Sequence, residues 1–441
     1  MISKGLLKVG AVGGLGLILL VALILIGAAV SERSERRAAV LQEMTQTSAG
    51  EQVLSGPVLV LPYELHTQAT AIDSKGVTSN RPTITRYEKV IMPRVLSING
   101  QMQTEKRYRS LYEALIYATT FHLEGSFEFP DPKDVTVAEG SRIHWLKPYV
   151  VVLVKDARGI TTIPNLKWNG GNIPVKPGQP SAILTGSNGF HAEVSEQVRE
   201  GGRFSYEIDF LLRGTHSLSW IPLAEATTVT LSANWPHPSF QGRSLPKSHS
   251  ITGEGFTAAW ESTRYATNIP QVISNQLNEA VTWQTETVGL RLIQPVDIYQ
   301  QAERSVKYGA LFIFLTFAAF LLFEVLKKLP IHPVQYGLVG LALVLFYLLL
   351  LGLSEHIDFA WAYGIATLSS VSLLGFYLRH ALHSKTLGAG FAASLAGLYG
   401  IMYGIILSED YALLYGSILL FALLAGAMIA TRRVNWYALK S

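Results

Sequence analysis

The residues best suited to chemistry lie in a short polar stretch between two apolar runs near the C-terminus. Glu355, His356 and Asp358 place two carboxylates beside an imidazole. Such groups can bind a metal ion, relay protons or respond to pH near neutrality. The zinc-protease spacing H-E-x-x-H is absent here. We therefore favour a solvated loop whose acidic groups suit the start of the next helix, and keep Glu355 and His356 as candidate functional residues.

Other polar groups surround the preceding break between apolar runs. His332 and Gln335 flank Pro333, and a proline fits the first turn of a helix because its missing N–H would have no partner there. This pattern favours an interfacial turn and helix cap over a ligand site. Glu324 lies just before Lys327 and Lys328, and an ion pair at the membrane interface with a lysine one turn further on explains it more simply than a functional role.

Aromatic and basic candidates occur further toward the N-terminus. The stretch NWPHPSF contains Trp235, His237 and Phe240, whose rings can stack on a sugar or a partner. A rigid turn between strands, with its aromatic rings filling the edge of a β domain, is the simpler interpretation. Arg304 and Lys307 lie just outside an apolar run, where they can contact anionic lipid headgroups or extend along the helix toward water.

Composition excludes several classes of function. The chain has no cysteine, so disulfides, thiolate metal sites and cysteine nucleophiles are absent. Neither a nucleotide-binding glycine loop nor a G-x-S-x-G motif is present. The net charge of +4 does not indicate nucleic acid, because many basic residues border apolar segments. We expect no catalytic residues, no metal, no cofactor and no nucleic-acid partner.

The candidate residues are separated by apolar runs long enough to cross a bilayer, which takes roughly 20 residues of helix. The first run, residues 9–30, is long for a signal peptide and lacks a good cleavage site, so we interpret it as a retained anchor. Five more runs follow near the C-terminus, at residues 308–325, 334–353, 359–378, 387–407 and 411–430. The sequence therefore predicts six transmembrane helices.

The charges of the short connections predict the orientation of these helices. Lys- and Arg-rich short loops stay in the cytoplasm. With the N-terminus inside the cytoplasm, every basic connection lies inside and every acidic connection lies outside. The basic connections contain Lys327/Lys328, Arg379/Lys385 and Arg432/Arg433, and the acidic ones contain Glu355/Asp358 and Glu409/Asp410. Both termini are predicted to be cytoplasmic, with the large domain periplasmic.

Between the first and second apolar runs the chain alternates apolar and polar residues, which is typical of half-buried strands. Residues 117–129 and 206–212 show the alternation, and residues 149–154 form a continuous apolar run that indicates a buried strand. The predicted fold is an α+β membrane protein with a large antiparallel β-sandwich-like outer domain. Its size allows two lobes with a boundary near residues 174–189. The predicted parts are residues 1–8, 9–30, 31–307, 308–430 and 431–441.

Several stretches taken together resemble the CreD family of bacterial inner membrane proteins, in order and over essentially the whole chain. They are SGPVL at 55–59, NWPHPSF at 234–240, PVDIYQ at 295–300, IHPVQY at 331–336, LSEHI at 353–357, EDYALL at 409–414 and TRR at 431–433, with Arg304 and Lys307-Tyr308. The resemblance implies an inner membrane protein linked to cell-envelope integrity and to a two-component envelope or nutrient response. It supplies no catalytic residues.

We expect a non-enzymatic inner membrane protein whose periplasmic domain binds membrane lipid, an envelope protein or a glycan. A domain tethered by a helix on each side is held at the membrane and can transmit an external event to the helices. Two alternatives remain open. A transporter or channel component would need polar groups meeting inside the bundle, and a glycan-processing hydrolase would need a carboxylate or serine–histidine cluster in a cleft.

Overall fold

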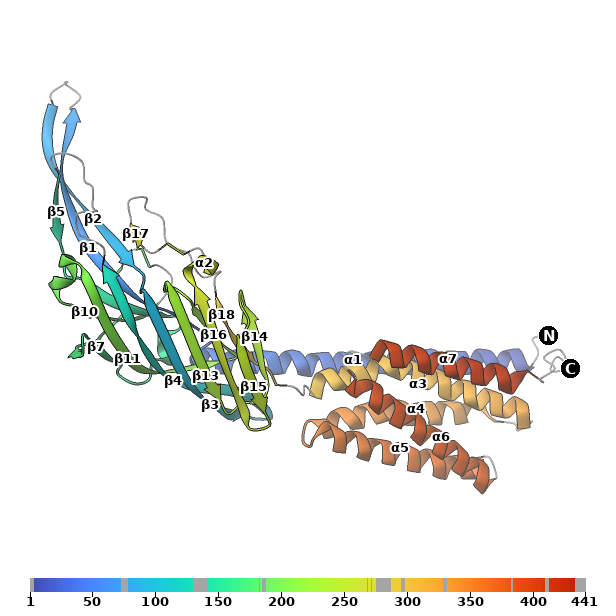
Figure 1. Ribbon diagram of the computed structural model, residues 1–441. Coiled ribbons are helices and arrows are strands. Elements are labelled where there is room, and N and C mark those ends of the chain that lie inside the picture. Colours follow the sequence, from blue (N-terminus) through green and yellow to red (C-terminus); the bar gives the residue numbers. More distant parts are fainter. Residues whose placement is uncertain are drawn as a thin grey trace. The chain divides into compact units, whose positions relative to one another are not determined.

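The computed structural model of the protein describes residues 4–72, 78–129, 141–181, 183–184, 188–267, 269–270, 272–274, 287–294, 298–327, 331–381, 384–408 and 412–432. The chain divides into a helical unit, Met1–Ala39 with Val296–Ser441, and a β unit, Val40–Pro295 (Figure 1). Part of the predicted orientation depends on Lys328, Glu409, Asp410 and Arg433, which lie outside the described residues.

The helical unit contains the apolar runs. Its helices are α1 (Lys4–Thr47), α3 (Ile298–Lys327), α4 (Pro333–Ser354), α5 (Phe359–Ala381), α6 (Lys385–Leu407) and α7 (Ala412–Thr431). Among the described residues, five helices are long and apolar enough to cross a membrane, and α7 contains a shorter apolar stretch, Leu414–Gly426. Helices α3 to α6 pack against one another in chain order, and α3 also packs against α6. The start of α1 and the end of α7 lie at the same end of this unit (Figure 1).

Helix α3 begins at Ile298, ten residues before the start expected from hydropathy. The extra turns contain Gln300, Gln301, Glu303 and Arg304, which are polar but are all good helix formers. Hydropathy marks the part of a helix that lipid can solvate, and α3 extends beyond that part with Tyr299, Ala302 and Ser305 buried against the unit. Helix α1 is likewise one unbroken helix that contains the predicted anchor and its polar extension.

The β unit contains two mixed sheets. One has the order β14 (Pro238–Gly242), β18 (Val288–Leu292), β12 (Ser217–Ile221), β1 (Gln52–Ile72), β6 (Tyr149–Val154), β10 (Asn188–Glu193) and β9 (Lys176–Pro177), with β2 (Thr78–Ile91), β5 (Arg142–Trp145) and β17 (Val272–Ser274) attached through β1 and β2. The other has the order β15 (Ser248–Thr252), β16 (Gly255–Thr263), β13 (Ala226–Ala233), β3 (Val95–Arg109), β4 (Tyr112–Phe129), β11 (Gly202–Thr215), β7 (Asn165–Trp168) and β8 (Gly171–Ile173). Short helices η2 (Ala157–Gly159), η3 (Glu196–Glu200) and α2 (Arg264–Thr267) complete the unit.

The expectation of purely antiparallel sheets needs correction. Strand β1 pairs with β12 in parallel, and β3 pairs with β13 in parallel. Each of these partners follows after a long stretch of intervening chain, as a parallel pair requires, and local alternation of residue types carries no information about that return. The other pairs of described strands are antiparallel, including the long β1–β2 hairpin that projects beyond the rest of its sheet (Figure 1).

Inward-facing side chains of both sheets form one shared core. The predicted alternation is confirmed: Phe121 and Leu123 on β4 and Ile208 on β11 are buried, while Thr120 and Glu124 on either side of the β4 pair are exposed. All six residues of β6 are buried, as its continuous apolar sequence predicted, because a second apolar cluster covers the other face of β1 and β6.

Candidate functional site

Two carboxylate clusters join α1 to the other helices. In the first, Lys8 of α1 forms an ion pair with Glu324 of α3, and Tyr336 Oη of α4 donates a hydrogen bond to Glu324 Oε2 at 3.0 Å. The sequence predicts a lysine one turn further along the chain as the partner of Glu324. The structure instead supplies Lys8, more than 300 residues earlier, because helix packing brings α1 beside α3.

The second cluster surrounds Glu355, which the sequence had singled out. Arg33 Nη1 of α1 lies 3.2 Å from both Glu355 carboxylate oxygens. Tyr299 Oη of α3 donates to Oε1 at 3.2 Å. The Glu355 side chain is only 9% exposed. A carboxylate this buried is costly unless charged and hydrogen-bonding groups surround it, so the three residues stabilise one another.

Close packing holds α1 between these clusters. Leu15, Leu19 and Leu23 recur every four residues and therefore lie on one face of the helix. Two of these leucines pack directly against glycines of other helices. A methyl group at Gly340 of α4 would lie 2.1 Å from Leu19 Cδ1, and one at Gly309 of α3 would lie 2.9 Å from Leu23 Cδ2. Small residues allow this close approach in membrane helices.

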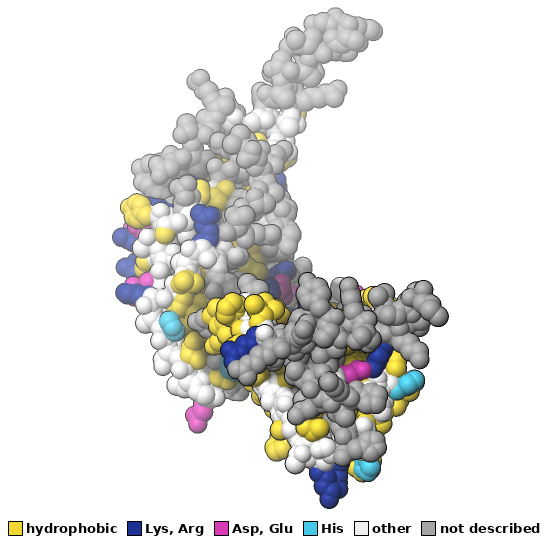
Figure 2. Space-filling view, turned by 90° about the vertical axis from the view of Figure 1, so that its right-hand side faces the viewer, with side chains coloured by type: hydrophobic (Ala, Val, Ile, Leu, Met, Phe, Trp, Pro, Cys, Tyr) yellow, Lys and Arg dark blue, Asp and Glu magenta, His cyan; other side chains and the backbone are white. Residues whose placement is uncertain are grey.

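The spacing of the two clusters along α1 matches the membrane. Lys8 and Arg33 are 25 residues apart (33 minus 8), or about 38 Å at a rise of 1.5 Å per residue. A bilayer with its headgroup regions is about 40–45 Å thick. Figure 2 looks onto the end of the helical unit where α1 begins, and charged side chains appear there as small spots among apolar ones.

Four other predicted residues of the helical unit have local roles. Arg304 Nη1 lies 3.5 Å from the carbonyl oxygen of Ile406, near the end of α6, where a cation is favourable. Lys307 pairs with Glu303 one turn earlier at 2.9 Å. Gln335 and His332 form a reciprocal cap at the start of α4.

The other predicted residues pack locally. His356 is exposed, and its Nδ1 lies 3.1 Å from the carbonyl oxygen of Gly352. In the β unit, Trp235 Nε1 donates to the carbonyl oxygen of Ile293 at 3.0 Å, and its ring meets that of His237 edge-on. The ring of Phe240 packs against Phe256 and Trp260. These aromatic residues therefore lie against the edge of the core.

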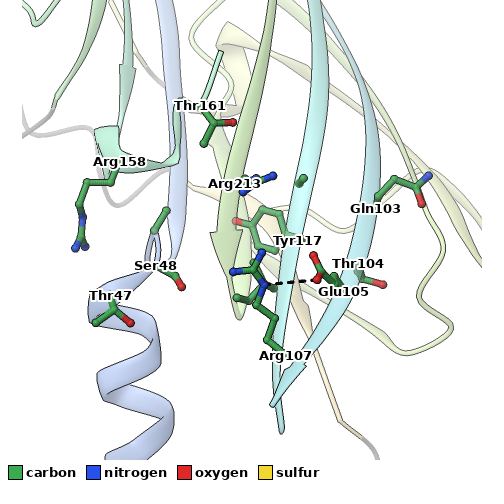
Figure 3. Close-up of a pocket in the computed structure, with 13 residues that line it drawn as sticks. Thr47, Ser48, Gln103, Thr104, Glu105, Arg107, Tyr117, Arg158, Thr161 and Arg213 are labelled. Carbon is green, nitrogen blue, oxygen red and sulfur yellow. Dashed lines mark ion pairs between the residues drawn. The ribbon is translucent and has the colours of Figure 1, made fainter. Parts of the chain in front are cut away.

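The β unit contains a pocket of about 310 Å³ that sequence reasoning missed (Figure 3). Its lining comes from the end of α1, strands β3, β4 and β11, and the segment around η2; the polar residues among it are Thr47, Ser48, Gln103, Thr104, Glu105, Arg107, Tyr117, Arg158, Thr161 and Arg213. No sequence signal could have found it, since five segments supply the side chains and only the fold brings them together.

Asp156 and Arg158 attach the end of α1 to the β unit. Arg158 Nη1 donates to the carbonyl oxygen of Gln46, in the last turn of α1. Asp156 Oδ2 accepts from the Gly50 N–H at 3.1 Å and from Arg158 Nη2 at 2.6 Å. The hydrogen bond from Arg158, followed by the one from the Gly50 N–H, lowers the pKa of Asp156 to about 2 despite partial burial.

The sequence matches the family described as "Inner membrane protein CreD" over residues 4–437. The inner membrane protein CreD of Escherichia coli is 34% identical over 433 residues, which cover 98% of this chain and 93% of that protein.

Solved structures show only weak likeness. A putative nutrient binding protein from Legionella pneumophila has a TM-score of 0.24 at 9% identity, over 51% of this chain and 77% of that one. A mutant M1 zinc metallopeptidase from Deinococcus radiodurans has a TM-score of 0.18 at 9% identity, over 39% of each chain. Such low scores carry no inference about function.

Proposed function

The chain belongs to the CreD family of inner membrane proteins, and from this premise we propose that it supports cell-envelope integrity without catalysing a reaction. In this proposal the β unit lies in the periplasm and binds a partner, a lipid or a glycan. Helix α1 then transmits that binding event to the helices in the membrane. The nine residues singled out by the sequence serve this architecture by fixing helix ends and the edge of the β core.

One observation carries the proposal: α1 is a single helix whose two parts are each fastened to a different unit. In the helical unit, Lys8 and Arg33 bind carboxylates on other helices. In the β unit, the carbonyl oxygen of Gln46 accepts from Arg158. In this proposal, a shift at the outer end of α1 is carried along the helix and changes the forces on its inner contacts.

The proposed topology follows from the charges of the connections and from α1. We infer that α7 is a sixth span, that both termini are cytoplasmic and that the two sheets of the β unit stack as a periplasmic sandwich. The common end of α1 and α7 (Figure 1) is consistent with termini on one side.

The interior of the described bundle favours a mechanical role over a transport pathway. Tyr363 Oη donates to the carbonyl oxygen of Tyr399 at 2.7 Å, and Ser370 Oγ lies 3.2 Å from Tyr399 Oη. These hydroxyl groups satisfy one another among packed aromatic rings. The carboxylates Glu324 and Glu355 instead bind α1, near the two ends of its apolar segment.

The test breaks α1 between the units without touching either set of contacts. Ala38 is exposed on α1 next to the boundary, and proline inside a helix costs about 3 kcal/mol and removes a backbone hydrogen bond. We expect Ala38→Pro to insert into the membrane but to fail to restore resistance to a membrane-perturbing detergent in cells that lack the protein. Ala38→Leu is the matched control and should restore it. Full restoration by Ala38→Pro would refute transmission through α1.

A further inference from the structure

We propose that the pocket beside the end of α1 binds a phosphate group, carried either by a small ion in solution or by a lipid headgroup. The inference rests on the proposed function, since it assigns a ligand class to the binding role of the β unit. The pocket volume of about 310 Å³ suits a small ligand.

Strand register builds the floor of the pocket. Gln103 of β3 lies opposite Ala118 of β4, and Ala118 lies opposite Arg213 of β11, so all three side chains share one face of the sheet. Arg107 lies on the same face, four residues further along β3. The small Ala118 side chain between two longer ones leaves space over the middle strand.

The donors of this pocket exceed its acceptors. Arg213 makes no ion pair or hydrogen bond through its side chain with any residue that the structure describes, and the same holds for the hydroxyl groups of Ser48 and Thr161. Arg107 is 3.6 Å from Glu105, a long and exposed ion pair that contributes little. A ligand that accepts several hydrogen bonds would satisfy these groups.

The geometry and charge select an oxyanion. Three guanidinium groups, of Arg107, Arg158 and Arg213, line the pocket. Asp156 and the Gln46 carbonyl already engage Arg158, so Arg107 and Arg213 are the groups that remain for a ligand, beside the carboxylate of Glu105. Guanidinium groups match phosphate because they donate parallel hydrogen bonds in a fixed fork. In Figure 3 Arg107 and Arg213 come from two different strands, so an anion between them can accept hydrogen bonds from both, while Arg158 lies apart from them.

The position of the pocket links such a ligand to α1. Thr47 is the last residue of α1 and Ser48 directly follows it. Both residues line the pocket together with β3 and β11. A phosphate group held by Arg213 and the Ser48 hydroxyl would tie the helix end to the sheet. The ligand would thereby strengthen the attachment through which α1 transmits force.

Binding is measured by isothermal titration calorimetry on the full-length protein in detergent, with inorganic phosphate, sn-glycerol 1-phosphate and acetate as separate probes. We expect binding of a phosphate probe that weakens roughly 10- to 100-fold in Arg213→Gln and in Arg107→Gln, the range that one hydrogen bond to a charged group provides. Arg203→Gln is the matched control. Arg203 is exposed on β11, on the same face as Arg213, and it contacts Ser126 outside the pocket. Its replacement by glutamine removes the same charge as Arg213→Gln.

The probes separate the sources of the phosphate. Binding of inorganic phosphate indicates a free ion, and binding of glycerol 1-phosphate alone indicates a headgroup. The proposal would be overturned if neither phosphate probe released or absorbed heat on titration. It would also be overturned if acetate bound as tightly as phosphate, or if Arg203→Gln weakened phosphate binding as much as Arg213→Gln does. Because Ala38→Pro leaves the pocket intact, it should bind phosphate normally, so failure of binding and failure of transmission are distinguishable.

Discussion

At the residue scale, Asp156 is the group on which the attachment of α1 to the β unit depends. Its carboxylate accepts hydrogen bonds from Gly50 N–H and from Arg158, which in turn donates to the carbonyl oxygen of Gln46. The side chain is 18% exposed. One carboxylate thus organises both the residues that follow α1 and the last helical carbonyls.

The lowered pKa of Asp156 predicts a pH-dependent stability. Since the pKa falls from 3.8 to about 2 on folding, the stabilisation is fully present above pH about 5 and is lost as the pH falls toward 2. Asp156→Asn should lower the free energy of unfolding of the β unit by about 1–2 kcal/mol at pH 7, allowing for solvent screening, and by much less near pH 2. Urea unfolding followed by tryptophan fluorescence at several pH values measures this.

The control for this prediction is Glu196→Gln, which removes an exposed carboxylate paired with Arg199. It should change the unfolding free energy by less than about 0.5 kcal/mol at any of these pH values. An Asp156→Asn variant with the same pH profile as the unaltered protein would show that this carboxylate does not hold the end of α1.

Sequence could identify single residues but not their partners. Glu355 stood out because it and Asp358 place two carboxylates beside the imidazole of His356, and the structure shows it in a charged cluster. Its partner Arg33 is 322 residues away, and nothing in the local pattern distinguishes that arginine from Arg36 or Arg37 nearby. The same limit applies to Arg213, whose importance appears only when the strands are in register.

At the element scale, the packing of α1 on α4 depends on Gly340. A side chain at this position meets Leu19, which is itself buried, so neither group has free space to move into. We expect Gly340→Val to destabilise the protein by about 1–3 kcal/mol, as overpacking of a tight contact does. Thermal unfolding in detergent, followed by circular dichroism, measures the effect.

Gly352 provides the comparison on the same helix. A methyl group there meets no atom within 4 Å, so Gly352→Val should leave the unfolding temperature almost unchanged. If both variants lose the same stability, the cost arises from valine in a helix and not from the contact between α1 and α4.

Elements were predictable where one local pattern determined them. The alternation on β4 and β11 and the apolar run of β6 specified these strands, because burial on one or two faces leaves a direct imprint on the sequence. The parallel β1–β12 pair and the early start of α3 left no such imprint on the local sequence. The first is a long-range contact, and the second is a polar helical extension, packed on one side, that hydropathy cannot detect.

At the scale of the whole molecule, the distribution of charge predicts the orientation in the membrane. The chain has no cysteine, so a single introduced thiol reports one position. Thr252→Cys, on the exposed strand β15, should react with a membrane-impermeant thiol reagent added to cells whose outer membrane has been permeabilised, with the inner membrane intact. Thr386→Cys, exposed near the start of α6, should react only after the inner membrane is opened. The opposite pattern would reverse the proposed topology.

The most direct test of the central claim, that α1 acts on the membrane helices through its charged clusters, is charge exchange at Arg33 and Glu355. Arg33→Glu and Glu355→Arg each place like charges together, and the double variant restores an attractive pair. The measurement is detergent resistance of cells in which each variant replaces the protein, with equal membrane insertion verified. We predict that each single variant fails and that the double variant recovers resistance. Full resistance in the single variants, or none in the double variant, would contradict the account.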